Sequence, residues 1–240
     1  MSDEVALAVG ASVGWHDSWM RAFGLRTETD ADAWRLLDRP PKIWYFTAIT
    51  RRPGAPPDAL ANSVGTVCDA WSRLDLEPLG FERREAEPWF FRPAGPLASE
   101  PSPHELEIMR TTTPEEVAEF EAVSVRGFET EDAWIEAGSA HPSTILGDPR
   151  MTNWIGRVAG RPVAAAMSYQ ADRAIGVFGV TTVASARRRG YGTAITRAAV
   201  LADSGLPSVL APSPEAENLY KRIGFRRVGE LQQWRRSPEP

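Results

Sequence analysis

The chain has 240 residues, a formal net charge of −5, 42% hydrophobic residues and 25% charged residues, which suits a globular protein of one large or two modest domains. Its single cysteine, Cys68, excludes an internal disulfide and multi-cysteine metal centres, and no two of its three histidines lie at ligand spacing, so we expect no metal. Because the amino end is acidic and no run of 18 apolar residues occurs, we expect a cytoplasmic protein without a membrane partner.

Residues 1–102 are predicted to form a smaller α/β domain. Trp15, Trp19 and Phe23 recur four residues apart, which predicts a helix, and residues 34–37 are interpreted as part of a second helix. Residues 42–50 include consecutive aromatic side chains and predict a strand. Aromatic residues at helical spacing belong more often to a core than to a ligand platform, so we expect most of these side chains to be buried.

A connector rich in proline, glycine and serine spans residues 91–103 and predicts a boundary between two domains, 1–102 and 103–240. Alternating and helical patterns then predict a strand, a helix with a capping box, a short helix and a hairpin of two strands. In chain order these elements are 105–110, a helix that begins at Thr113-Pro114, 131–137, 153–158 and 163–170.

A basic turn with two glycines joins the next strand to the next helix. The short apolar run 174–180 predicts a buried strand, and apolar residues at helical spacing predict a helix from Ala194 onwards. The turn between them places several peptide N–H groups at the positive end of a helix, where a pyrophosphate can bind. Gly190 and Gly192 allow a close approach to that backbone because neither carries a Cβ.

A second helix and strand follow at the carboxyl end. The run 207–211 is apolar and predicts a strand, and prolines then precede a helix that ends at Gly224. Leu219, Tyr220 and Ile223 fall three and four residues apart and form one apolar face. We expect a pair of strands after Gly224.

The spacing Arg187-x-x-Gly190-x-Gly192, followed about 30 residues later by Leu219-Tyr220 and Gly224-Phe225, resembles the GCN5-related N-acetyltransferase (GNAT) family. The resemblance implies an α/β fold of the α+β kind, in which a mixed, mostly antiparallel sheet contains a splayed pair of parallel strands and is flanked by helices. It also implies acetyl-CoA as co-substrate, no metal, and direct transfer of the acetyl group to a primary amine of a small molecule or a protein.

The resemblance also assigns roles to residues. Tyr220 matches the family tyrosine that gives the departing thiolate a proton, so we expect it to be catalytic, and we expect a backbone N–H near 180–182 to stabilise the oxyanion. The pantetheine arm is expected to pair with the backbone of the first splayed strand. A serine stands where the family often has an asparagine, and its hydroxyl can replace that contact. The residues assigned to the coenzyme are Val180, Thr182, Val183, Arg187, Arg188, Arg189, Gly190, Tyr191, Gly192, Thr193, Ser213 and Asn218.

The general base is missing from the expected place. Many family members carry a glutamate on the strand that here spans 176–180, and this run contains no carboxylate. Glu129, Glu131 and His141 could act through a water, although such groups are more often solvated loop residues. A non-catalytic module that binds acyl-CoA and regulates a partner therefore remains the alternative.

The last part of the chain carries an excess of positive charge, since residues 187–240 contain ten Lys or Arg and five Asp or Glu. We expect no nucleic-acid partner, because the sequence pI is near 5.4 and no aromatic platform accompanies the basic cluster. A homodimer is compatible with the sequence and is not specified by it.

The amino-terminal part echoes the carboxyl-terminal one. The run 71–84 and the run 219–227 both suggest a helix, a Gly-Phe pair and a strand, with the pairs at Gly80-Phe81 and Gly224-Phe225. Either this is coincidence or residues 1–102 are a degenerate, GNAT-like half. Because no Arg-x-x-Gly-x-Gly occurs before residue 100, we expect that half to be non-catalytic.

Overall fold

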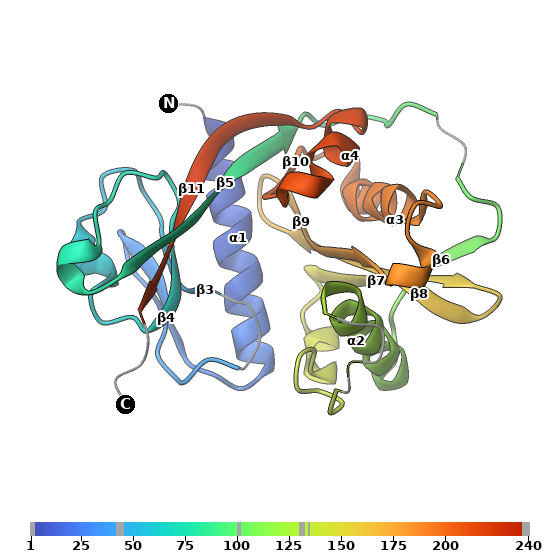
Figure 1. The fold of residues 1–240 in the computed structure, drawn as a ribbon, viewed down its shortest axis with the longest axis horizontal. Coiled ribbons are helices and arrows are strands. Elements are labelled where there is room, and N and C mark those ends of the chain that lie inside the picture. Colours follow the sequence, from blue (N-terminus) through green and yellow to red (C-terminus); the bar gives the residue numbers. More distant parts are fainter. Residues whose placement is uncertain (1–2, 42–45, 100–101, 130–132, 134, 237–240) are drawn as a thin grey trace.

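A computed structural model describes residues 3–41, 46–99, 102–129, 133 and 135–236. Its strands form one eleven-stranded sheet in the order β1-β2-β3-β4-β11-β5-β10-β9-β8-β7-β6 (Figure 1). The strands are β1 Thr27–Thr29, β2 Ala33–Leu36, β3 Phe46–Thr50, β4 Gly65–Asp69, β5 Glu82–Arg92, β6 Leu106–Arg110, β7 Met151–Val158, β8 Arg161–Gln170, β9 Ile175–Thr182, β10 Ser208–Leu210 and β11 Arg226–Arg236. The α-helices are α1 Asp3–Ala22, α2 Pro114–Phe128, α3 Tyr191–Val200 and α4 Glu217–Arg222.

Short 3-10 turns connect several of these elements: Pro57–Leu60, Glu77–Leu79, Ser143–Gly147, Ala184–Ala186, Leu201–Asp203 and Pro214–Ala216.

The helices cover the two faces of the sheet. Trp15 of α1 and Phe120 of α2 belong to one hydrophobic cluster, whereas Ile195 of α3 and Tyr220 of α4 belong to another. Side chains of β5 alternate between the two clusters, with Phe91 on the α1 side and Phe90 on the α3 side. The sheet therefore separates a face made by α1 and α2 from a face made by α3 and α4.

Strands from the two parts of the chain are interleaved. β5 lies between β10 and β11 and is antiparallel to both, and β11 lies between β5 and β4. Figure 1 shows this long β5–β11 pair beside α1 in the middle of the molecule. On either side of the pair stands a parallel pair, β3 with β4 and β9 with β10. The two parts do not each form a sheet of their own, and the domain boundary at residue 102 stays a prediction.

Most elements of the carboxyl-terminal part match the sequence expectations. Thr113 caps α2 in a capping box with Glu116, with proline at the start of the helix. Ala159 and Gly160 both have positive φ, 49° and 75°, and form the two-residue turn between β7 and β8. The short helix expected over 131–137 falls partly outside the described residues, and those described in that range, 133 and 135–137, are not helical.

Three expectations were wrong. Residues 34–37 are not helical: Ala33–Leu36 is strand β2, in which pairing with β1 and β3 outweighs the local pattern. The expected carboxyl-terminal strand pair is one strand, β11, because β5 supplies its neighbour. In the echo, residues 71–76 are turn and coil instead of helix, although Gly80, with φ of 78°, does lead into strand β5.

Two buried histidines make stability depend on pH. Burial lowers the pKa of His16 to about 4, although its hydrogen bond with the Ser12 carbonyl acts in the opposite direction, and burial lowers the pKa of His141 to about 3. The unfolded chain therefore binds protons that the folded chain does not, from about pH 6.5 downwards. We expect the free energy of unfolding to fall by up to about 1.4 kcal/mol per pH unit for each histidine between about pH 6.5 and about pH 4.

Urea unfolding at about pH 7 and about pH 5 measures this effect. The variant His104→Gln is the control, because the His104 side chain is 98% exposed, and it should keep the pH dependence of the unaltered protein. Equal free energies of unfolding at the two pH values would contradict the prediction.

Candidate functional site

The parallel strands β9 and β10 separate soon after they meet. They pair only at Ile175 with Ser208 and at Gly176 with Val209, so within the described residues no strand flanks the rest of β9 on that edge. The backbone N–H of Val183 donates to the Val163 carbonyl of β8, and residues of an antiparallel ladder alternate in direction. The backbone of Thr182 therefore faces the open edge, as expected for a residue that pairs with an added strand, whereas Val180 lies where the ladder is irregular, between Phe178 and Thr181.

A β-bulge shapes this edge. The register between β8 and β9 shifts between Ala165 and Met167, opposite Gly179, which has a φ of +57°. A Cβ on Gly179 would lie 2.4 Å from the Met167 Cε atom. Gly179 and Val180 are partly exposed, and because glycine has no side chain, the exposed atoms of Gly179 belong to its backbone. Sequence reasoning missed this feature, although a lone glycine inside a strand pattern is its usual signal.

The glycine turn after β9 exposes a set of peptide N–H groups. Arg188 has a φ of 63° and Gly190 a φ of 82°, and α3 begins directly afterwards at Tyr191 without a side-chain cap. Within the described residues no acceptor is recorded for the N–H groups of Arg189, Gly190 or Gly192. A Cβ on Gly192 would meet the Thr182 Oγ1 atom at 3.5 Å and the Leu219 Cδ1 atom at 3.7 Å. These features fit a pyrophosphate held by backbone N–H groups at a helix start.

The three arginines of the turn differ in their surroundings. The Arg187 guanidinium donates from Nε to the Thr182 carbonyl at 3.0 Å and from Nη2 to the Gly127 carbonyl at 2.8 Å. It thus ties the turn to the end of β9 and to the last turn of α2. All three arginines are exposed. The coenzyme role expected of Arg187 stays a prediction, and the two hydrogen bonds of its guanidinium give it a positioning role in the turn as well.

The remaining expected coenzyme residues fall into two groups. The Val183 N–H donates to the Val163 carbonyl, so any contact of Val183 with the coenzyme would have to use its other atoms. The Tyr191 ring is buried and its hydroxyl donates to Glu105 at 2.8 Å, so only its backbone faces the turn. Three others are at least partly exposed: Thr193 on α3, Ser213 before α4 and Asn218 on α4. The Ser213 side chain hydrogen-bonds with Glu215.

Tyr220 lies on α4 with 7% of its surface exposed. Its ring packs edge-on against Phe225 at 5.9 Å between centroids. Burial raises the pKa of the Tyr220 hydroxyl well above its ordinary value. The hydroxyl therefore keeps its proton at neutral pH, where it can donate a hydrogen bond.

The candidate general bases differ in their exposure to solvent. His141 is buried, with its ring 4.4 Å from that of Trp19 and 4.9 Å from that of Phe120, so it is a core residue and not a base exposed to substrate. Glu129 follows α2 as an exposed C-cap residue. Glu131 lies outside the described residues. Of the three candidates, only Glu129 is described in a position where water can reach it.

Two residues of α2 that sequence reasoning missed help to build the site. Glu121 is 1% exposed, and its carboxylate accepts the N–H groups of Gly138, Ala140 and His141 at 2.7, 2.6 and 2.9 Å. Gly127 brings the end of α2 onto β9, since a Cβ there would lie 2.2 Å from the Thr181 Oγ1 atom. Glu121 could have been found, because it follows Val117 by four residues on the buried stripe.

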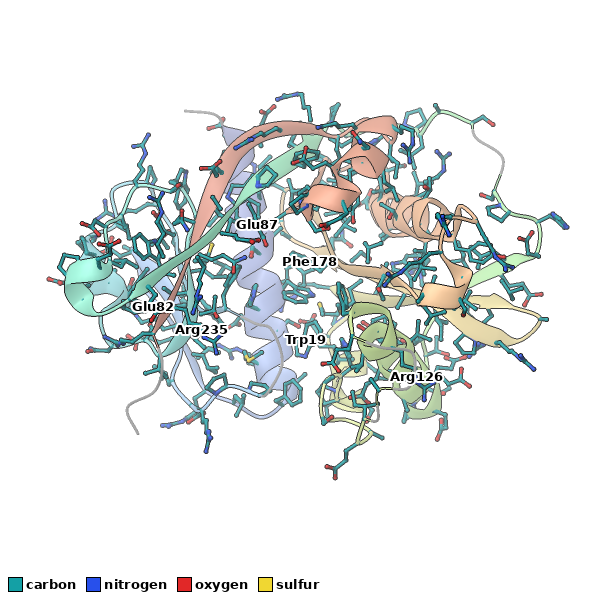
Figure 2. The ribbon with its side chains drawn as sticks, viewed as in Figure 1. Trp19, Glu82, Glu87, Arg126, Phe178 and Arg235 are labelled. Carbon is teal, nitrogen blue, oxygen red and sulfur yellow. The ribbon has the colours of Figure 1, made fainter. Side chains whose placement is uncertain are left out.

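An aromatic side chain of α1 contacts β9 next to the bulge. The Trp15 ring stacks on Phe178 at 4.4 Å with 15° between the planes, and Figure 2 shows Phe178 between α1 and β9. The partly exposed residues Gly179 and Val180 thus lie between the contact of α1 with Phe178 and the contact of α2 with Thr181.

Among the described residues, no group of three or more potential metal ligands is found. No helix in the described ranges is both long and apolar enough to cross a bilayer.

Comparisons with known proteins indicate a family and a fold. Residues 110–225 match the model of the acetyltransferase (GNAT) family. A GCN5-related N-acetyltransferase from Kribbella flavida has a similar fold, with a TM-score of 0.67 and 20% identity, over 95% of this chain and 96% of that chain. A protein from Novosphingobium aromaticivorans, assigned to the GNAT family as an acetyltransferase, has a TM-score of 0.61 and 19% sequence identity, over 97% of this chain and 99% of that chain.

A conserved protein of unknown function from Staphylococcus epidermidis gives a TM-score of 0.57 and 12% identity over 86% of this chain and 91% of that chain. At these identities the likenesses establish a shared fold. No curated protein sequence matches the chain.

Proposed function

Residues 110–225 belong to the acetyltransferase (GNAT) family, and from this membership we propose that the protein is an acetyl-CoA-dependent N-acetyltransferase that acts on a primary amine. One observation carries the proposal: the unflanked edge of β9 leads directly into the exposed N–H groups of the Arg187–Gly192 turn. An extended thioester arm that ends in a pyrophosphate needs these two surfaces in this order.

The chain's residues divide the work of binding. The N–H groups that follow Arg187 would hold the pyrophosphate of acetyl-CoA, and the backbones of Val180 and Thr182 would pair with the pantetheine arm. The amine would approach across Gly179 and Val180, between α1 and α2, where β9 is partly exposed. Holding amine and thioester together in this way supplies a large part of the rate.

The chemical step needs an oxyanion donor and a proton for the sulfur. A backbone N–H at the end of β9 would stabilise the oxyanion that forms when the amine attacks the carbonyl carbon. The Tyr220 hydroxyl, which keeps its proton because burial raises its pKa, would donate to the departing thiolate. Glu129 is the candidate that would receive the amine's proton through a water.

The amino-terminal half is proposed to be non-catalytic. The parallel strands of this half are β3 and β4. They stay together at their ends, where the Thr50 hydroxyl accepts the Ala70 N–H at 2.9 Å, whereas β9 and β10 separate. The buried Asp69 carboxylate accepts backbone N–H groups at the same place, which puts negative charge where a phosphate would have to lie. The helix after β3 is only a short turn, Pro57–Leu60. These features support a single coenzyme site.

Replacing Tyr220 with phenylalanine is expected to lower kcat about 100-fold or more, because general acid catalysis is lost. Coenzyme affinity should stay close to that of the unaltered protein, since the ring still packs against Phe225. Release of free thiol from acetyl-CoA in the presence of a panel of small-molecule and peptide amines measures turnover, and calorimetry measures binding.

The matched control is Tyr169→Phe, the same change at a buried tyrosine of β8 that the proposed mechanism does not use. It should keep its turnover. Coenzyme binding without amine-dependent thiol release over the whole panel would contradict the enzyme and favour the alternative, a regulatory module that binds acyl-CoA. The acceptor class, small molecule or protein, and the cytoplasmic location belong to the same proposal.

A further inference from the structure

A pocket of about 420 Å³ lies beside the phosphate turn, on a different side of α3 from the open edge of β9. Its lining includes Gly190, Thr193 and Arg197, which recur at helical spacing and so form one stripe of α3. Gly192 lies off this stripe and faces Thr182 and Leu219. The pocket is therefore a second surface next to the turn and is not the groove proposed for the thioester arm.

Three parts of the chain bring positive charge to this pocket. Arg189 comes from the turn, Arg197 from α3 and Arg222 from the end of α4. Glu105 also lines the pocket, but it accepts the Tyr191 hydroxyl and lies 3.3 Å from His104. The side chains that line the pocket therefore carry more positive than negative charge.

A fourth arginine stands behind them. Arg92, the last residue of β5, is 7% exposed. Burial lowers the pKa of the Arg92 guanidinium, and the positive charge of the nearby Arg197 lowers it further. The partners recorded for its guanidinium among the described residues are all carbonyl oxygens, those of Ile223, Pro93, Gly95 and Pro96. Carbonyls satisfy its N–H groups but carry no net charge, so a nearby anion would be stabilised.

The connector between the two halves forms the outer wall. Ser102 and Pro103 line the pocket, and a Cβ on Gly190 would be 3.4 Å from the Pro103 Cγ atom. Arg197 donates from Nη2 to the Ala98 carbonyl at 2.6 Å, which holds the connector against α3. The amino-terminal half therefore reaches the coenzyme side of the molecule through β5 and the connector.

We propose that this pocket binds the phosphate monoester on the ribose of the coenzyme, so that Arg197 and Arg222 select the 3′-phosphorylated nucleotide. This inference rests on the proposed function. A pyrophosphate can be held by backbone N–H groups alone, whereas a dianionic monoester away from the helix end needs side-chain cations. It gives the non-catalytic half a part in coenzyme recognition, because that half supplies Arg92 and Ser102.

The test compares the binding of acetyl-CoA and of its 3′-dephospho analogue by titration calorimetry. The unaltered protein is expected to bind acetyl-CoA at least about tenfold more tightly, as for the loss of a charged hydrogen bond. In Arg222→Gln and Arg197→Gln the Kd for acetyl-CoA should rise about tenfold and that for the dephospho analogue should change little. The control Arg227→Gln, on β11 and paired with Glu230, should keep the full preference.

Equal affinity of the unaltered protein for the two compounds would overturn this inference and leave the proposed function intact. An equal loss of affinity for both compounds in the two variants would also overturn it, because the arginines would then serve the whole ligand or the fold. Failure of both compounds to bind the unaltered protein would overturn the proposed function as well.

Discussion

Replacing Gly190 with aspartate is expected to abolish coenzyme binding, with a rise in Kd of at least about 100-fold. Gly190 precedes α3, and its own N–H belongs to the set that faces the proposed pyrophosphate. A carboxylate there would occupy the positive end of the helix and would repel the diphosphate. Titration calorimetry with acetyl-CoA measures the loss without requiring the acceptor amine.

Two controls separate charge from backbone strain. Gly190→Asn has nearly the same shape without the charge, and asparagine tolerates the φ of 82° better than most residues, so we expect it to retain much of the affinity. Gly24→Asp introduces the same side chain at a glycine with a φ of 76° and open space around it, and it should bind normally. Unchanged affinity in Gly190→Asp would show that the diphosphate lies elsewhere.

Replacing Glu121 with alanine is expected to lower the free energy of unfolding by roughly 3 kcal/mol, because three backbone N–H groups lose a charged acceptor and two of them are buried. For a chain of this size the melting temperature should fall by about 6–12 °C. Urea and thermal unfolding measure the two quantities.

Glu115→Ala is the matched control, since Glu115 is an exposed carboxylate on the same helix, and its loss should cost less than about 1 kcal/mol. Glu121→Gln keeps the shape and one carbonyl acceptor, so its stability should lie between those of the other two proteins. If Glu121→Ala proved as stable as Glu115→Ala, the carboxylate would not be the anchor of the 138–141 segment.

Local patterns predicted the elements that local chemistry determines. The capping box at Thr113 and the glycine turn before α3 lie within a few residues of the atoms that stabilise them. The hairpin of β7 and β8 was predicted too, although with residues 159–162 between its strands where the structure has only Ala159 and Gly160. The interleaving of β5 and β11 could not be predicted in this way. Alternation shows that a strand has two faces, but it does not show which of ten other strands will lie beside it.

The candidate site divides along the same line. Thr182 and Gly190 could be proposed from the sequence, because the role expected of each depends on its own backbone. The position of Arg187 depends on the Gly127 carbonyl, which lies 60 residues away in the chain, and no spacing rule connects the two. That the Val183 N–H is used within the sheet could not be predicted either, because the phase of the ladder with β8 decides which backbone groups are paired.

The interleaving of β5 and β11 also affects how the protein folds during its synthesis. When β4 leaves the ribosome, the strand that will lie beside it, β11, is still untranslated, because β11 begins only at Arg226. The first half therefore waits with an unsatisfied edge until β11 has been made, and a nascent chain that stops short of β11 leaves β4 and one edge of β5 open to aggregation.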